Sequence, residues 1–179
     1  MELSDFQTVE VHTLDKDSPS VKILSKVNNN QLLTTDLHRK VCDTLGLSKS
    51  SHGAFALFLG GLTPVRKLRP YDCITLPVTD LTFQKWCFDP KKEKELLKTD
   101  ANAAHWLFVQ ALNQVETGKI RPTKPQLQEL EECLNPAFCT EKQYVEICHT
   151  VEKYFEFCLD NCRLLTEVTC LDHPYRVST

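Results

Sequence analysis

Residues 100–118, DANAAHWLFVQALNQVETG, form the strongest helical pattern in the chain, and the remaining segments are interpreted around them. Apolar residues recur at intervals of three and four positions and so form one stripe along a helix: Ala104, Leu107, Phe108, Ala111, Leu112 and Val115. Thr99 or Asp100 can cap the amino end, and Gly118 suits the left-handed position after the last turn. We therefore expect this helix to be the central element of an all-helical lobe.

Further helices are predicted on both sides of the central helix. Residues 91–98, KKEKELLK, are charged and favour a helix, and strands are not indicated beyond this point until about residue 155. Residues 125–134 predict another helix with its proline in the first turn, and one more begins at Thr140. These segments predict a lobe of three or four helices.

The first 89 residues have the alternation of apolar and polar residues that is typical of strands. The predicted order is strand, strand, helix, strand, strand, short helical turn and strand, over 6–14, 20–27, 34–46, 55–59, 65–68, 70–77 and 81–88. Thr34 or Thr35 is available to cap the helix, and Gly46 ends it. This order is that of a ubiquitin-like β-grasp lobe, in which one helix covers one face of a four- or five-stranded sheet. The predicted fold class is α+β.

Length, charge and cysteine content limit the class of protein. A chain of 179 residues forms one domain or two small ones, and a net charge of −3 gives no support to nucleic-acid binding. The sequence shows neither a signal peptide nor a run of ~20 apolar residues that could cross a bilayer. We therefore expect the nine cysteines to be reduced, mostly buried thiols of an intracellular protein.

Sequence signals for catalysis, metals or cofactors are weak. The nearest approach to a zinc-binding pair is Cys158 with Cys162, or Cys148 beside His149, and neither has a matching second pair. The sequence contains neither a phosphate-binding P-loop nor a dinucleotide-binding glycine motif. We predict no catalytic, metal-binding or cofactor-binding residue and no enzymatic activity; a thiol or zinc enzyme remains the alternative.

Five short stretches resemble the FERM-like module of the sorting nexins that combine a PX domain with a FERM-like domain. They are FALFL (55–59), VRKL (65–68), KWCF (85–88), ELLKTD (95–100) and QALNQVETGKI (110–120). The resemblance covers roughly residues 40–165. It implies a ubiquitin-like F1 lobe at 1–89, a helical, acyl-CoA-binding-protein-like F2 lobe at 90–156 and the start of a truncated F3 lobe at 157–179.

The sequence also departs from the pattern of that family. The family has an acidic residue where this chain has Gln114 and an aromatic residue where it has Lys119. We find no PX domain ahead of the module within these 179 residues, so we expect the phosphoinositide binding that the family owes to that domain to have no carrier here. A complete F3 lobe, which supplies the sheet edge for NPxY-type peptides, would need about a hundred more residues. We therefore expect that this chain alone does not hold such a peptide.

The resemblance implies a function in protein recognition rather than catalysis. The implied role is that of a non-catalytic adaptor in endosomal cargo sorting, with Ras-type GTPases, trafficking machinery or cargo tails as partners. It further implies a cytoplasmic protein, peripheral on endosomal membranes, with weak contact to anionic lipid and no cofactor. The alternative is a cortical FERM protein that links the plasma membrane to the actin cytoskeleton.

Two groups of basic residues are the candidate binding surfaces. The candidates for binding a GTPase, whose acidic effector region would attract them, are Lys22, Lys26, Arg39 and Lys40. The candidates for an anionic membrane or partner are Arg66, Lys67, Arg69, Lys91, Lys92 and Lys94. The simpler interpretation of both groups is a solvated surface. In the second group, Glu93 and Glu95 alternate with the lysines, which is typical of a solvated helix end.

Three large aromatic residues are expected to join the two lobes. Trp86 and Phe88 end the last predicted strand, and Trp106 lies off the apolar stripe of the central helix. Because large aromatic side chains dominate apolar interfaces, we predict that all three pack between the lobes.

Overall fold

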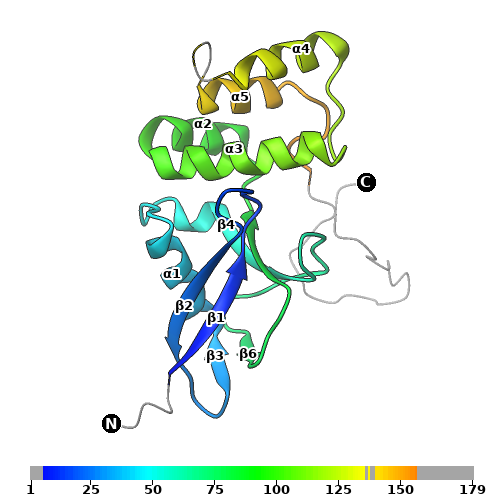
Figure 1. Cartoon of the computed structure of the whole chain (residues 1–179). Helices are drawn as coiled ribbons and strands as arrows, with labels where there is room; N and C mark the ends of the chain where they lie inside the picture. The colour runs from blue at the N-terminus through cyan, green and yellow to red at the C-terminus, as the bar shows by residue number, and fades with distance from the viewer. Residues whose placement is uncertain (1–5, 136, 138–139, 157–179) are drawn as a thin grey trace, which may run out of the picture.

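The computed structural model describes residues 6–135, 137 and 140–156, which form a sheet lobe and a helical lobe (Figure 1). The four helices of the second lobe lie together above the sheet in Figure 1, and α3 is the nearest of them to the strands. The predicted α+β class is confirmed. The predictions for residues 1–5 and for the start of an F3 lobe at 157–179 lie outside the described residues.

The main sheet has the strand order of a β-grasp lobe. Its strands are β1 (Phe6–His12), β2 (Ser20–Lys26), β4 (Phe55–Leu59), β5 (Arg66–Lys67) and β7 (Leu81–Lys85). The order across the sheet is β2-β1-β7-β4-β5, with β1 and β7 parallel and the other pairs antiparallel. The predicted hairpin is present, and β2 and β5 form the two edges.

Helix α1 (Thr34–Thr44) covers one face of the sheet. Its apolar face includes Leu37 and Val41, both fully buried, which stabilise the lobe by roughly 1.5–3 kcal/mol each. Gly46 ends the helix with φ of +71°, as predicted. The prediction of a threonine cap was wrong, because Leu33 is the N-cap and makes no side-chain bond. The first two helical N–H groups instead donate to the carbonyl oxygens of residues 72 and 70.

A second, two-stranded sheet was not predicted. β6 (Cys73–Thr75) lies where a turn of helix was expected, and it pairs antiparallel with β3 (Gln31–Leu33). Leu32 faces Ile74 across this pair, and both side chains are buried. These segments are too short for their periodicity to be distinguished from a turn, so pairing between distant residues decides the structure.

The helical lobe consists of four helices. They are α2 (Pro90–Thr99), α3 (Ala101–Glu116), α4 (Lys124–Cys133) and α5 (Glu141–Cys148). Asp100 caps α3 by accepting a hydrogen bond from the N–H of Ala103 (3.0 Å), and Gly118 has φ of +69°, both as predicted. Thr140 forms a capping box at α5.

Helix α3 is buried on two faces rather than one. Phe108 on the predicted stripe meets Tyr144 of α5 edge to face, with ring centroids 5.1 Å apart. On the face toward the sheet, the side chain of Gln110 is buried and its Oε1 accepts a hydrogen bond from the N–H of Lys85 (3.2 Å). The central helix therefore connects the helical lobe to the sheet lobe.

Candidate protein-interaction surface

The edge strand β2 presents a charged face, and Lys40 of α1 covers part of its backbone edge. Lys22, Leu24 and Lys26 are exposed on the sheet face opposite α1, and Leu24 has 61% of its surface exposed. The carbonyl of Leu24 faces away from β1, because it accepts a hydrogen bond from Lys40 of α1. In an antiparallel pair, the N–H and C=O of one residue point to the same side, so Leu24 also turns its N–H to the edge. Such an edge can accept a further strand from a partner.

Lys40 connects α1 to this edge strand. Its ammonium donates to the Leu24 carbonyl oxygen (2.9 Å) and to Ser25 Oγ (3.1 Å), both neutral acceptors. Arg39 Nη2 lies 3.1 Å from Asp36 Oδ1 in an exposed pair, which contributes little to stability. The structure thus places the four cations of the first predicted group on two adjacent elements, on both sides of the β2 edge: Lys22, Lys26, Arg39 and Lys40.

The second predicted basic group is divided between different partners. Arg66 pairs with Asp72 (2.8 Å), and Arg69 Nη1 donates to the hydroxyl of Tyr71 (3.2 Å). A hydrogen bond from the Arg69 N–H, assisted by the side chain of Arg66, lowers the pKa of Asp72. Lys67 Nζ lies 4.7 Å from the centroid of a Trp86 ring.

The lysines of α2 approach this region from the helical lobe. Lys91, Lys92 and Lys94 are exposed. Lys92 Nζ lies about 4 Å from where a side chain on Gly53 would begin. Lys67 lines a hollow of about 290 Å³ that Gly53 also lines and that Lys92 does not.

The three aromatic residues occupy two places. Trp106 of α3 borders a small space of about 10 Å³ together with Phe83 and Lys85 of β7, so it lies between the helical lobe and the sheet. Trp86 and Phe88 pack edge to face, with centroids 5.1 Å apart, and the Phe58 ring lies 5.9 Å from that of Trp86.

A buried polar cluster around Glu93, which the sequence analysis missed, joins the lobes. Glu93 of α2 is fully buried, so the interpretation of this residue as part of a solvated helix end was wrong. Its Oε2 lies 3.0 Å from Lys85 Nζ of β7, while Oε1 accepts hydrogen bonds from His149 Nε2 (3.0 Å) and the Tyr154 hydroxyl (2.5 Å). The Lys85 ammonium also lies 3.8 Å from the Tyr154 ring centroid.

The residues around Glu93 favour the charged form of its buried carboxylate. Burial alone would raise the pKa of Glu93, but the hydrogen bond from His149, the charge of Lys85 and the bond from Tyr154 together lower it. Burial lowers the pKa of Lys85, and Glu93 offsets part of that effect. The cluster explains how α2 is fixed to the sheet, and it has the features of a structural joint between the lobes.

Asp100 forms a second polar joint. Its Oδ2 accepts hydrogen bonds from the Ser48 N–H (2.9 Å) and the Ser51 hydroxyl, both in the sheet lobe, while Oδ1 caps α3. Burial opposes the charge, but the bonds from Ser51, Ala103 and Ser48 lower the pKa of Asp100 to about 2. The capping prediction for Asp100 was therefore correct but incomplete.

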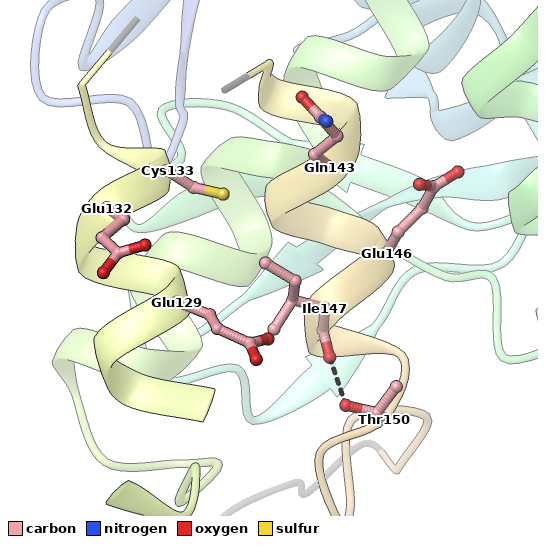
Figure 2. Close-up of a pocket in the computed structure, with 7 residues that line it drawn as sticks. All are labelled: Glu129, Glu132, Cys133, Gln143, Glu146, Ile147 and Thr150. Atoms are coloured by element: carbon pink, nitrogen blue, oxygen red, sulfur yellow. Dashed lines mark hydrogen bonds between the residues drawn. The ribbon is translucent and has the colours of Figure 1, made fainter. Parts of the chain in front are cut away.

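A hollow of about 470 Å³ lies between α4 and α5 (Figure 2). Figure 2 shows Glu132 and Glu146 on opposite sides of this hollow, with Ile147 between them. Within the described residues, no group of three metal-ligating side chains converges.

The described thiols agree only in part with the expectation of reduced cysteines. Free thiols are present at Cys42, Cys73, Cys87 and Cys148, and all of these except Cys73 are buried. Cys133, which lines the hollow between α4 and α5, is disulfide-bonded, so the expectation of a reduced thiol was wrong at this position.

The fold is thus that of a two-lobed α+β protein with a charged edge strand. No family model matches the chain. Sorting nexin-31 of Mus musculus is 28% identical over 94% of this chain and 38% of its own length. Sorting nexin-31 of Homo sapiens is 27% identical over 80% of this chain and 34% of its own length. Sorting nexin-31 of Xenopus tropicalis is 28% identical over 66% of this chain and 30% of its own length.

The chain is thus similar to sorting nexins over most of its length, and it spans 38% or less of these curated relatives. Among the described helices, none has the length and apolar character needed to cross a membrane.

Proposed function

We propose that the chain forms the first two lobes of a FERM-like module, F1 at 1–89 and F2 at 90–156, in a non-catalytic adaptor of endosomal cargo sorting. Three observations support this proposal: the β-grasp strand order, the helical lobe that follows it and the similarity to sorting nexin-31. The buried contacts of Glu93 and Asp100 would hold the two lobes as one scaffold.

The partner that this surface fits best is a Ras-type GTPase. The observation that carries this part of the proposal is the edge of β2, which has Lys22 and Lys26 on one side and Arg39 and Lys40 on the other. An acidic partner strand placed beside β2 would displace the Lys40 ammonium from the Leu24 carbonyl and would meet cations on both sides. Such charges mainly accelerate association and set orientation.

A charge-reversal experiment tests this proposal. Binding of GTP-loaded and GDP-loaded Ras-family proteins is measured by calorimetry for the unmodified chain and for Lys22→Glu/Lys26→Glu. The double variant reverses two exposed charges without altering a described hydrogen bond. The matched control is Lys91→Glu/Lys94→Glu, which makes the same change in charge on α2, away from the β2 edge.

The proposal requires binding that depends on the nucleotide. We expect the GTP-loaded form to bind at least about tenfold more tightly, and the β2 variant to lose about tenfold in affinity while the α2 control is unchanged. Equal weak binding of both nucleotide states by all three proteins would remove the GTPase from the proposal.

The alternative function is that of a cortical FERM protein that links membrane and actin. The three exposed lysines of α2 favour it, because Lys91, Lys92 and Lys94 can contact an anionic membrane surface. Sedimentation with phosphoinositide vesicles tests it, with Lys91, Lys92 and Lys94 neutralised in the comparison protein. Absence of vesicle binding by the intact chain would rule it out.

A further inference from the structure

An apolar hollow of about 290 Å³ lies between α1 and the first half of β4, and we call it the α1–β4 hollow. Its walls are formed mainly by Thr34, His38, Phe55, Leu57, Leu68 and Trp86. Burial lowers the pKa of His38, so its ring is neutral, and His38 Nε2 donates a hydrogen bond to the Phe55 carbonyl oxygen (3.0 Å). A group that enters this hollow would therefore be held largely by apolar contact.

Thr34 adds a polar group without a partner to this wall. The residue is only 3% exposed, and its Oγ1 makes no hydrogen bond to any residue that the structure describes. The neighbouring Thr35, by contrast, donates through its hydroxyl to the carbonyl oxygen of Pro70 (2.6 Å). A buried hydroxyl that lacks a partner lowers stability, so native proteins seldom keep one without a reason. A polar group of a ligand in the hollow would supply the missing partner.

The charges beside the α1–β4 hollow are positive. Lys67 lines it, and its ammonium lies 4.7 Å from the centroid of a Trp86 ring. Lys92 is exposed, and its Nζ lies 4.0 Å from where a side chain on Gly53, another lining residue, would begin. No carboxylate is found among the described residues that line the hollow. The hollow and its surroundings thus complement an apolar group with acidic neighbours.

A strand edge beside the hollow favours a peptide over a small molecule. Among the described strands, β5 pairs only with β4 and so forms one edge of the sheet. The N–H of Leu68 donates to the Leu57 carbonyl oxygen (2.9 Å), and successive residues of an antiparallel strand turn alternately toward and away from the partner strand. Lys67 therefore turns its N–H and C=O away from β4. An extended segment added at this edge can place a side chain in the adjoining hollow.

We propose that the α1–β4 hollow receives one bulky apolar side chain of an acidic, extended segment in a protein partner. The apolar walls surround that side chain, and a polar group of the segment pairs with Thr34. Lys67 and Lys92 attract the carboxylates beside it. Apolar contact decides which side chain is accepted, and the charges mainly set orientation and the rate of association.

Fluorescence anisotropy of a fluorescein-labelled peptide with the intact chain tests the proposal. The peptide carries one Phe with Asp and Glu on both sides, and its control has Ala in place of the Phe. We expect the Phe peptide to bind about tenfold more tightly than the Ala peptide. Lys67→Glu should lower the affinity for the Phe peptide about tenfold, whereas Lys142→Glu, an exposed charge reversal on α5, should leave it unchanged.

The variant Thr34→Val separates a binding role of the hydroxyl from a structural one. Because this hydroxyl has no described partner, the variant should keep or raise the denaturation midpoint, while its affinity for the Phe peptide falls about threefold. A lower midpoint with unchanged affinity would show that the hydroxyl serves the fold, and it would overturn the role given to Thr34.

Other occupants of the hollow would give different results. Equal affinity for a peptide with Asn and Gln in place of Asp and Glu would assign the hollow to an uncharged apolar ligand. Self-association in analytical ultracentrifugation that Lys67→Glu abolishes would assign it to a second copy of the chain. Either result would overturn the proposal. Equal affinity of Lys67→Glu and Lys142→Glu for the Phe peptide, with both variants folded by circular dichroism, would overturn it as well.

The outcome is independent of the GTPase proposal. β2 and β5 are opposite edges of the sheet, and neither Lys22 nor Lys26 lines the α1–β4 hollow. Lys22→Glu/Lys26→Glu should therefore keep its affinity for the Phe peptide even where it loses the GTPase.

Discussion

Glu93 shows how a single charged residue can depend on partners from other elements of the fold. Its oxygens contact Lys85, His149 and Tyr154, and both members of the Lys85 ion pair are almost completely inaccessible to solvent. A buried ion pair is weak evidence for added stability, but the loss of one partner leaves the other charge uncompensated. Glu93 is therefore expected to be among the residues least tolerant of substitution.

Removal of the Glu93 carboxylate should strongly destabilise the protein. We expect Glu93→Ala to lower the free energy of unfolding by about 3–5 kcal/mol, because Lys85 would remain buried without its partner. Denaturant unfolding measures the change. Glu95→Ala is the matched control, since Glu95 is an exposed glutamate on the same helix and should cost less than about 0.5 kcal/mol. Similar values for both variants would contradict the assignment of Glu93 as a buried joint.

Asp100 should make the free energy of unfolding depend on pH in the acidic range. Its pKa is about 2 in the folded protein against an ordinary value of 3.8, so folding is favoured by the charged form. The contribution is fully present above the unfolded pKa and is lost as the pH falls from about 5 to 2; it amounts to roughly 2 kcal/mol. In Asp100→Asn, the free energy of unfolding should be lower near neutral pH and should fall less in this range. An unchanged acid slope in the variant would contradict the assignment.

At this scale the sequence predicted local roles but not distant ones. Asp100 as a cap and Gly118 as the helix end follow from adjacent residues. The bonds from Ser48 and Ser51 to Asp100 span 52 and 49 positions, and those from His149 and Tyr154 to Glu93 span 56 and 61, so none of them has a local signal. The alternation of Glu and Lys indicated a solvated helix because charge patterning alone does not reveal a buried partner.

Among the elements, edge strand β2 and helix α3 illustrate what periodicity can and cannot predict. Alternation in β2 correctly separates Lys22 and Lys26 from Ile23. The stripe on α3 predicted that this helix packs within the helical lobe, where Phe108 meets Tyr144 of α5. It did not predict the second face, where Gln110 binds the backbone of Lys85. A buried glutamine has no apolar signature, so the contact between α3 and the sheet was apparent only through the aromatic residue Trp106.

The exposed apolar residue of β2 offers a test that separates binding from stability. Leu24 faces solvent, so Leu24→Ser should change the free energy of unfolding by less than about 0.5 kcal/mol. If a partner strand covers this face, the same variant should bind the GTP-loaded GTPase several-fold more weakly, since apolar area is lost from the interface. Unfolding and calorimetry on one preparation give both values. Unchanged binding would place the partner elsewhere.

For the whole molecule, the Glu93 and Asp100 joints imply that the two lobes behave as one unit. The joints connect β7 with α2, and the loop after α1 with α3, while Trp106 packs between the lobes. The order of lobes was predictable because strand and helix periodicities occupy separate halves of the described chain. Their mutual fixation was not predictable, because it depends on polar contacts between the halves.

This coupling predicts a single unfolding transition. Tryptophan fluorescence and far-ultraviolet circular dichroism should give the same denaturation midpoint for the unmodified chain, since Trp86 and Trp106 report near the sheet while helices dominate the dichroism. Combination of Glu93→Ala with Asp100→Asn should separate the two midpoints. Separate midpoints in the unmodified chain would show that the lobes unfold independently.

The central claim is that the β2 edge and α1 recognise an acidic protein partner in a nucleotide-dependent way. The most direct measurement is the ratio of affinities for GTP-loaded and GDP-loaded Ras-type GTPase, compared between Lys22→Glu/Lys26→Glu and Lys91→Glu/Lys94→Glu. The account predicts that the ratio exceeds about ten in the unmodified chain and in the α2 control, and falls toward one in the β2 variant. A ratio near one in all three proteins would contradict it.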